Sequence, residues 1–179
     1  MKPKRIEATY SLIERLRDSV SGDAFWFPYL TELLSDPCHT RAVHLGIFNQ
    51  PYLDFIFDGT KTIESRFSSV RCAPLYCVKD GDIILMKRSG GPIVGLFCAG
   101  EVRSYRLRSQ VWKTIKERFG EGIAPASPDF WRENESAVYA TLMEVEHVRH
   151  VDPLAWDKSD RRGWVVLHRR RSTNLTLFD

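Results

Sequence analysis

Residues 59–66 constrain the fold more than any other stretch, because the hydrophobic pattern changes its period there. Upstream, the apolar run Pro51–Phe57 fits one or two turns of helix, and Gly59 supplies the positive φ that a helix C-terminus commonly needs. Downstream the period is two, so Thr62, Glu64 and Arg66 share one face of a predicted strand and Ile63 points to the other. With Lys61 at the corner between helix and strand, this concentration of charge beside apolar residues indicates a functional site.

The rest of the chain alternates between predicted helices and strands. Two amphipathic helices come first, and helices are also expected at 110–119 and from Ser127 onward, where Pro128 takes the first helical position. The first two helices are expected at 6–20 and 25–34. The strands are expected at 42–48, 62–66, 82–88, 93–105, 137–151 and 163–167. Several strands around one or two helices predict a single α+β domain built on a small β-barrel. No linker-like composition follows the first two helices, so we expect residues 1–40 to form a helical extension packed on a domain of residues 41–179.

The order of these motifs resembles a known family. A helix, Gly59-x-Lys61-Thr62-x-Glu64-x-Arg66, and then the turn Lys79-Asp80-Gly81-Asp82 opening the apolar strand Ile83–Met86 are similar to the ASCH domains of the PUA-like superfamily, over roughly residues 42 to 168. The resemblance implies a PUA-like small β-barrel with flanking helices. It also implies a function on RNA, a nucleotide or a modified nucleoside.

The resemblance suggests roles for two residues. In small bacterial relatives that hydrolyse N4-acetylcytidine, the Lys of this motif and a Thr three positions later are catalytic. Lys61 matches the Lys, but Glu64 stands at the Thr position. The further catalytic carboxylate of those enzymes has no motif here, and Glu117, Glu133 and Glu135 are candidates by region only.

The residues themselves leave two interpretations of the charged strand open. A partly desolvated Lys61 has a lowered pKa and can act as a base or nucleophile, with Glu64 as a general base. Alternatively, Lys61, Glu64 and Arg66 form a structural ion-pair network that closes the barrel. Arg66 can present its guanidinium fork to a phosphate, or pair with Glu64.

Other candidate ligand-binding residues lie nearby in the sequence. Asn49 and Gln50 can read a base edge through their amides, or cap the helix that follows. The turn Ser89-Gly90-Gly91 can offer backbone amides to a phosphate, or be a simple hairpin turn. Arg161, Arg162 and Trp164 suit phosphate contact and base stacking, while Trp164 can equally begin a strand and pack in the core.

The composition and the distribution of charge limit the kinds of partner that the protein is expected to bind. The chain has 179 residues, 43% hydrophobic and 27% charged, and a formal net charge of +3. Its basic residues gather at 103–118 and 158–171, in the pattern that a phosphate backbone requires. The four cysteines, Cys38, Cys72, Cys77 and Cys98, have no metal-ligand spacing, so we expect reduced thiols, no metal and no cofactor. Without a long apolar segment or an apolar signal segment, we expect no membrane partner and a cytoplasmic location.

Three functions remain open at this stage. The first is a module that binds RNA or a nucleotide, with Lys61, Glu64 and Arg66 at the floor of its pocket. The second is a small hydrolase, acting on a modified nucleoside such as N4-acetylcytidine or on RNA as a ribonuclease. The third is a protein-interaction module that presents the aromatic residues of 25–29. The oligomeric state is left open.

Overall fold

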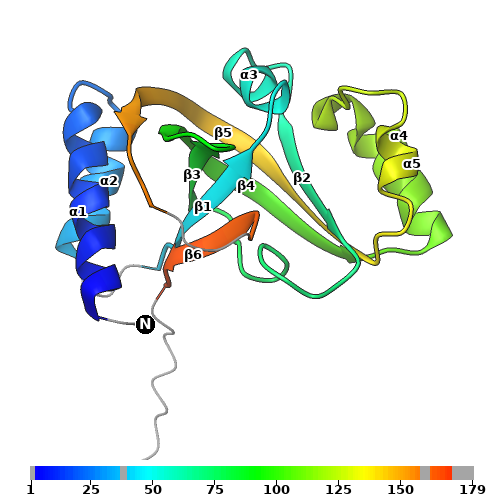
Figure 1. Ribbon diagram of the computed structural model, residues 1–179, viewed down its shortest axis with the longest axis horizontal. Coiled ribbons are helices and arrows are strands. Elements are labelled where there is room, and N and C mark those ends of the chain that lie inside the picture. Colours follow the sequence, from blue (N-terminus) through cyan, green and yellow to red (C-terminus); the bar gives the residue numbers. More distant parts are fainter. Residues whose placement is uncertain (1–2, 37–39, 158–161, 171–179) are drawn as a thin grey trace, which may run out of the picture.

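The computed structural model describes residues 3–36, 40–157 and 162–170, which form one curved sheet with helices at both ends (Figure 1). The helices are α1 (Pro3–Ser19), α2 (Trp26–Ser35), α3 (Tyr52–Phe57), α4 (Ser109–Ile123) and α5 (Phe130–Glu133). The strands are β1 (Val43–Phe48), β2 (Ile63–Ser68), β3 (Ile83–Arg88), β4 (Ile93–Arg106), β5 (Tyr139–Leu154) and β6 (Trp164–His168). The elements expected from the sequence are therefore present, with ends shifted by a few residues; α4, for example, runs on to Ile123.

Over the described residues, the sheet is mixed and does not close. Its strand order is β2-β5-β4-β3-β1-β6, with β1 and β3 parallel and the other neighbours antiparallel. The result is a half-barrel whose two edge strands are β2 and β6. The expected α+β class with a small, barrel-like sheet is confirmed.

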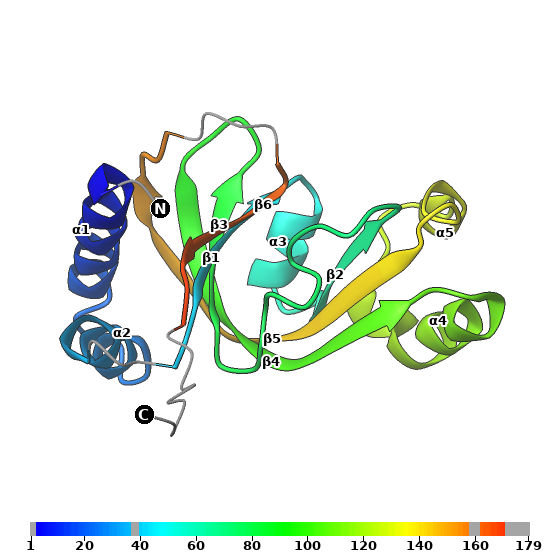
Figure 2. The same ribbon diagram turned by 90° about the horizontal axis from the view of Figure 1, so that it is seen from below.

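The strands β4 and β5 form the spine of the molecule. They are 14 and 16 residues long and pair with each other along most of their length, so they reach from α1 and α2 at one end to α4 and α5 at the other (Figures 1 and 2). Their register shifts at three places, and His147 has a φ of 50°. Such irregularities bend a strand and increase its twist, which lets the long pair curve around the core.

The first two helices pack against the sheet. Leu16 of α1 and Trp26 and Leu30 of α2 are almost fully buried and share one hydrophobic cluster with Leu45 of β1 and Leu96 of β4. The indole N–H of Trp26 also donates to the carbonyl oxygen of His147 over 2.6 Å. Of the aromatic residues at 25–29, Trp26 is buried, Phe25 and Tyr29 are half-buried, and Phe27 is 38% exposed, so Phe27 is the ring of this group that a partner could reach.

Two further clusters position the functional region. One fills the half-barrel behind α3 and includes Leu53, Ile56 and Phe97. The other lies between α4 and the far ends of β2, β4 and β5, and includes Ile115 and Phe119. We call α4 and α5 together the helical lobe. The lobe and α3 stand on either side of β2 (Figure 1).

Candidate functional site

The corner between α3 and β2 has the geometry that the sequence predicts. Gly59 has a φ of 81°, which places it in the left-handed region and ends α3. The amide of Lys61 then donates to the carbonyl oxygen of Phe55 over 2.7 Å, which turns the chain back beside the helix. As a result Lys61 stands at the base of α3, at the point where β2 begins.

Lys61, Glu64 and Arg66 form one connected network. The Nζ atom of Lys61 donates to the carbonyl oxygen of Ile123 over 2.8 Å and lies 3.6 Å from Oε2 of Glu64. The other carboxylate oxygen of Glu64 accepts from Nε of Arg66 over 2.6 Å. Arg66 also donates from Nη2 to the carbonyl oxygen of Ile47 over 3.0 Å. The strand face predicted for Glu64 and Arg66 is thus observed, and their charges bridge β2, β1 and the helical lobe.

Burial changes the acidity of Lys61. The residue is 3% exposed, and desolvation lowers its pKa from the usual value of a lysine. The negative charge of Glu64 opposes this shift, whereas the positive charge of Arg66 adds to it. A lysine in this state releases its proton more readily than one in water, as a base or nucleophile requires.

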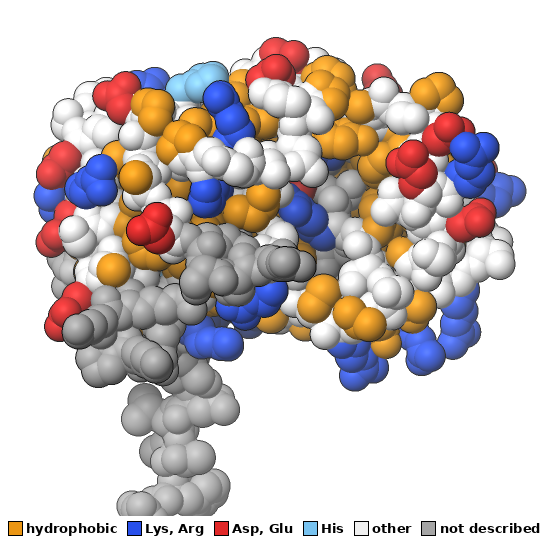
Figure 3. Space-filling model, in the orientation of Figure 1, with side chains coloured by type: hydrophobic (Ala, Val, Ile, Leu, Met, Phe, Trp, Pro, Cys, Tyr) orange, Lys and Arg blue, Asp and Glu red, His pale blue; other side chains and the backbone are white. Residues whose placement is uncertain are grey.

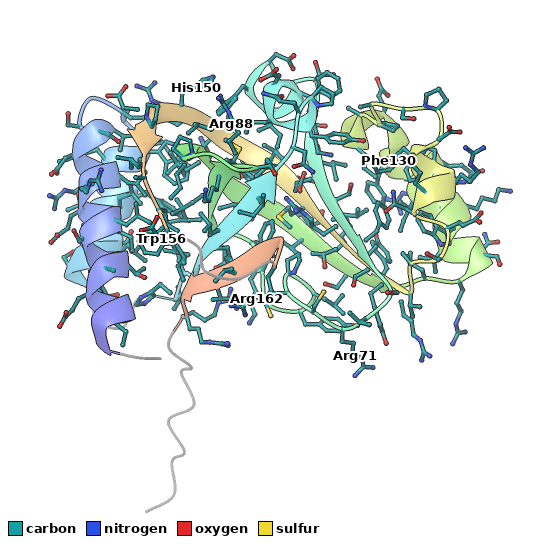
Figure 4. The ribbon with its side chains drawn as sticks, viewed as in Figure 1. Arg71, Arg88, Phe130, His150, Trp156 and Arg162 are labelled. Atoms are coloured by element: carbon teal, nitrogen blue, oxygen red, sulfur yellow. The ribbon has the colours of Figure 1, made fainter. Side chains whose placement is uncertain are left out.

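The network forms the floor of a pocket of about 140 Å³. We call it the Lys61 pocket; it is lined by Ile47, Phe48, Asn49, Tyr52, Lys61, Glu64, Ser65, Arg66 and Phe130. Tyr52 of α3 and Phe130 of α5 supply aromatic walls, with their ring centroids 6.2 Å apart and their planes at 57°. Figure 3 shows the surface hollowed between the sheet and the helical lobe, and Figure 4 shows Phe130 on the lobe side.

Asn49 and Gln50 have different surroundings. Both are exposed, but only Asn49 lines the Lys61 pocket. The side-chain amide of Gln50 donates to Oδ1 of Asp54 in α3 over 2.9 Å. Gln50 therefore makes a contact at the start of the helix, and Asn49 is the one of the two that can face a ligand.

The turn Ser89-Gly90-Gly91 is not among the residues that line this pocket. The amide of Ser89 donates to the carbonyl oxygen of Phe48, and that of Gly91 to the carbonyl oxygen of Arg88, each over 2.9 Å. These amides are used within the sheet and the hairpin, so they are not offered to a phosphate. The second wall of the pocket comes from Phe130 instead.

Trp164 is part of the core beside the pocket. It is 3% exposed, and its indole N–H donates to Nδ1 of His44 over 3.2 Å. The guanidinium carbon of Arg66 lies 5.1 Å from the centroid of its ring. Trp164 is therefore not an exposed platform for stacking a base, although its edge lines two neighbouring hollows. Arg162 is exposed beside it, and Arg161 lies outside the described residues.

Sequence reasoning missed several contributors to the site, among them Tyr52, Phe130 and the carbonyl group of Ile123. Tyr52 could have been identified from the sequence, because it is the first aromatic residue of the predicted helix. Phe130 and Ile123 are more than 55 residues from Lys61 in the chain, and no local pattern links them to it. The carboxylates considered as further catalytic groups, Glu117, Glu133 and Glu135, do not line the pocket.

The second element of the resemblance, Gly81-Asp82, serves the fold. Oδ1 of Asp82 accepts from the amide of Ala42, while Oδ2 accepts from the amide of Lys79 and contacts Nε2 of His44 and the guanidinium of Arg170. Burial raises the pKa of Asp82, but these hydrogen bonds outweigh burial and hold it below its usual value. Asp82 thus fastens the starts of β1 and β3 to the end of β6.

The described part of the chain contains no group of three or more His, Cys, Asp or Glu side chains placed to hold a metal ion. None of its helices combines the length and the apolar character that crossing a membrane requires.

The curved mixed sheet with its flanking helices matches the fold of solved ASCH domain structures. No family model and no curated protein sequence matches the chain. Among solved structures, the crystal structure of ASCH from Zymomonas mobilis is similar, with a TM-score of 0.51 and 18% identity over 64% of this chain and 73% of that one. A mutant of the same protein gives a TM-score of 0.51 and 19% identity, over 64% of this chain and 76% of the other. The chain therefore has the ASCH fold that its sequence motifs indicate.

Proposed function

We propose that this protein binds RNA or a nucleotide, with one base in the Lys61 pocket. The observation that carries the proposal is the pairing of aromatic walls with a charged floor. Tyr52 or Phe130 can stack on one face of a base, since base stacking on aromatic side chains tolerates any base. The charged floor formed by Lys61, Glu64 and Arg66 supplies hydrogen bonds to the polar edge of that base.

Arg66 is the main anion-binding group of this floor. Nε and Nη2 are held by Glu64 and Ile47, which fixes the plane of the guanidinium against Phe48 and Trp164. A guanidinium fixed in this way loses little conformational entropy when it binds a phosphate. Asn49 adds an amide at the rim, which can donate to and accept from a base edge.

The proposal is tested by titrating a fluorescein-labelled single-stranded RNA and following its anisotropy. The variants are Arg66→Ala, Arg66→Lys and Arg15→Ala. We expect Arg66→Ala to weaken binding by roughly 5- to 150-fold, equivalent to about 1–3 kcal/mol. Arg66→Lys restores part of the affinity, because it keeps the charge but loses the fork.

Arg15→Ala is the matched control, since Arg15 is an exposed arginine of α1 at the opposite end of the molecule. It should bind as the wild type does. Circular dichroism melts of each variant separate lost binding from lost fold. Equal affinity of Arg66→Ala and wild type, with both folded, removes Arg66 from the site.

A second candidate function is hydrolysis of an acylated cytidine, and the buried Lys61 favours it. Under this function Lys61, whose pKa desolvation lowers, activates water or attacks the acyl carbon, and Glu64 relays a proton. The test is incubation of N4-acetylcytidine with wild type and Lys61→Ala, followed by chromatography of the nucleosides. Cytidine formed by the wild type alone supports the hydrolase, while no conversion at high protein concentration leaves binding as the function.

The same pair of proteins tests ribonuclease activity. Each is incubated with the labelled RNA, and the products are separated on a denaturing gel. Cleavage by the wild type and not by Lys61→Ala assigns the ribonuclease to this pocket; equal cleavage by both assigns it to a contaminant or to another site.

A further inference from the structure

The half-barrel has an open seam between its two edge strands. In the sheet of the described residues, β2 pairs only with β5 and β6 pairs only with β1. The loop that follows β2 lies in the gap between them (Figure 2). This loop and the two strands line a pocket of about 190 Å³, to which Arg66, Cys72 and Trp164 contribute.

The hollows along this seam adjoin the Lys61 pocket at Arg66. The Lys61 pocket and the 190 Å³ pocket share Arg66. The 190 Å³ pocket shares Cys72, Ala73, Gly163 and Trp164 with a larger one of about 590 Å³, which extends to Arg162 and Arg169. We call the two seam hollows together the seam groove. The seam groove and the Lys61 pocket are neighbours, with Arg66 lining both, and their lining residues extend from Phe130 to Arg169.

The seam groove has charges of one sign. Arginines stand at its two ends: Arg66 near the Lys61 pocket, and Arg162 and Arg169 at the far side. No Asp or Glu is among the described residues that line it. A fourth arginine, Arg71, lies at the rim, where its Nε donates to the hydroxyl of Tyr139 over 3.2 Å.

The remaining lining suits a ribose-phosphate chain. Ser68, Tyr139 and Thr141 carry hydroxyl groups, and Gly163 has no side chain to obstruct the floor. Figure 4 shows Arg162 and Arg71 on the side of the molecule where β6 and the loop after β2 lie, and Figure 3 shows Lys and Arg side chains along the same lower edge. Arginines and hydroxyl groups without carboxylates are the usual contacts of a phosphodiester backbone.

We infer that the seam groove carries the backbone of a single-stranded RNA away from the Lys61 pocket, with Arg162 and Arg169 as its phosphate contacts. This inference rests on the proposed function and makes it more specific, because the ligand becomes a nucleotide within a strand. A groove that tracks a flexible backbone beside a base pocket is the arrangement of single-strand binding, whereas a double helix presents a broad rigid surface.

The experiment compares two probes, a fluorescein-labelled RNA of about twelve nucleotides and free cytidine 5′-monophosphate. The test protein is Arg162→Gln/Arg169→Gln, and its charge-preserving counterpart is Arg162→Lys/Arg169→Lys. The matched control is Arg15→Gln/Arg149→Gln, which removes two exposed arginines that line neither the seam groove nor the Lys61 pocket. Affinity for the RNA is measured from 50 to 200 mM salt, and affinity for the mononucleotide by calorimetry. Each single-strand phosphate contact contributes a slope of about −0.7 to log K against log salt.

We expect the Gln pair to weaken RNA binding by roughly tenfold or more at low salt and to make the salt slope shallower by about 1.4, for two lost contacts. Its affinity for the mononucleotide should equal that of the wild type. The Lys pair should keep the wild-type slope, and so should the control pair.

An unchanged RNA affinity and salt slope in the Gln pair overturns the inference, while the proposed function stands because the wild type still binds. Equal losses for RNA and mononucleotide also overturn it, since the arginines then act on the base pocket. A wild type that binds neither probe overturns the proposed function, and the inference with it.

Discussion

Lys61 donates to the carbonyl oxygen of Ile123 over 2.8 Å, and this bond joins the floor of the pocket to the last residue of α4. The carbonyl end of a helix carries partial negative charge, so it suits an ammonium group. A second link, from the amide of Ala126 to the hydroxyl of Tyr52 over 3.3 Å, connects the lobe to α3. The two walls of the Lys61 pocket are thus held together by residues that also line it.

The first prediction concerns the dependence of stability on pH. The pKa of Lys61 in the folded protein lies below the ordinary value of 10.5. At pH values between these two pKa values, the unfolded state binds more protons than the folded state, so the free energy of unfolding rises with pH. Lys61→Met removes this contribution. We expect the free energy of unfolding of the wild type, minus that of Lys61→Met, to increase as the pH rises toward 10. Urea denaturation at several pH values measures the difference.

Other groups cancel in this comparison. Burial raises the pKa of Tyr29, which lowers stability above its usual pKa of 10.0 in both proteins alike. A difference between wild type and Lys61→Met that stays constant across the alkaline range would show that Lys61 is not desolvated as described.

The second prediction concerns the contact between α4 and β2. A Cβ atom added at Gly122 would lie 2.7 Å from Oγ1 of Thr62 and 3.0 Å from Cγ1 of Ile63. Gly122→Ala should therefore push the end of α4 off β2 and lower the free energy of unfolding by about 1–3 kcal/mol. Because the pocket lies at this junction, binding of RNA should weaken as well.

Gly120→Ala is the matched control within the same helix. Its added Cβ meets only Cζ2 of Trp131, at an ordinary 3.6 Å. Since alanine has the higher helix propensity, Gly120→Ala should be neutral or stabilising by up to about 1 kcal/mol. Chemical denaturation of both variants decides the point, and equal effects would mean that no close packing exists at Gly122.

The parts of the fold that sequence could predict are those set by local patterns. The period change after Gly59 places Lys61 at a corner, and the alternation of β2 places Glu64 and Arg66 on one face, because both depend only on neighbouring residues. The structure confirms the fold that these patterns and the family resemblance indicate.

What sequence could not predict depends on contacts between distant segments. Phe130 forms a wall of the pocket because β4 and β5 carry the helical lobe back beside α3. The sequence left the turn at Ser89 and Gly91 open between phosphate contact and a simple hairpin, and the sheet and hairpin use both amides. It also left Trp164 open between stacking and core packing, and pairing of β6 with β1 turns it inward. Each outcome follows from how the half-barrel curves, which no local spacing encodes.

The third prediction tests the structural role of Asp82. Its lowered pKa means that it stabilises the fold at pH values above the ordinary 3.8 and loses this effect as the pH falls through its lower, folded-state pKa. Asp82→Asn replaces one acceptor by a donor that faces the donors of Lys79 and Arg170. We expect it to cost about 3 kcal/mol or more near neutral pH.

The dependence of stability on pH in the acidic range distinguishes this electrostatic role of Asp82 from a simple loss of packing. Thermal melts between pH 3 and 7 should show a steeper loss of stability on acidification for the wild type than for Asp82→Asn. Parallel curves would mean that the carboxylate is not held in its ionised form by the network.

The fourth prediction concerns the hydrogen bond from Trp164 to His44. The indole N–H donates to Nδ1, so the ring proton of His44 lies on Nε2 and is donated to Asp82, 3.1 Å away. His44 is fully buried, and Trp164→Phe leaves its Nδ1 without this donor. A buried polar atom that loses its partner costs about 1–3 kcal/mol, and the smaller ring leaves a cavity as well. We expect urea denaturation to show a loss of at least about 2 kcal/mol.

Trp156→Phe provides the comparison, since it makes the same ring change at a half-buried position after β5 and should lower the free energy of unfolding by less.

Binding of cytidine 5′-monophosphate separates the structural effect from a functional one. Because Glu64 and Ile47 still hold Arg66, folded Trp164→Phe should bind this nucleotide within about twofold of the wild type. A large loss of affinity in the folded variant would instead make Trp164 part of the binding surface. In the denaturation experiment, equal destabilisation by Trp164→Phe and Trp156→Phe would exclude a special role for the bond to His44.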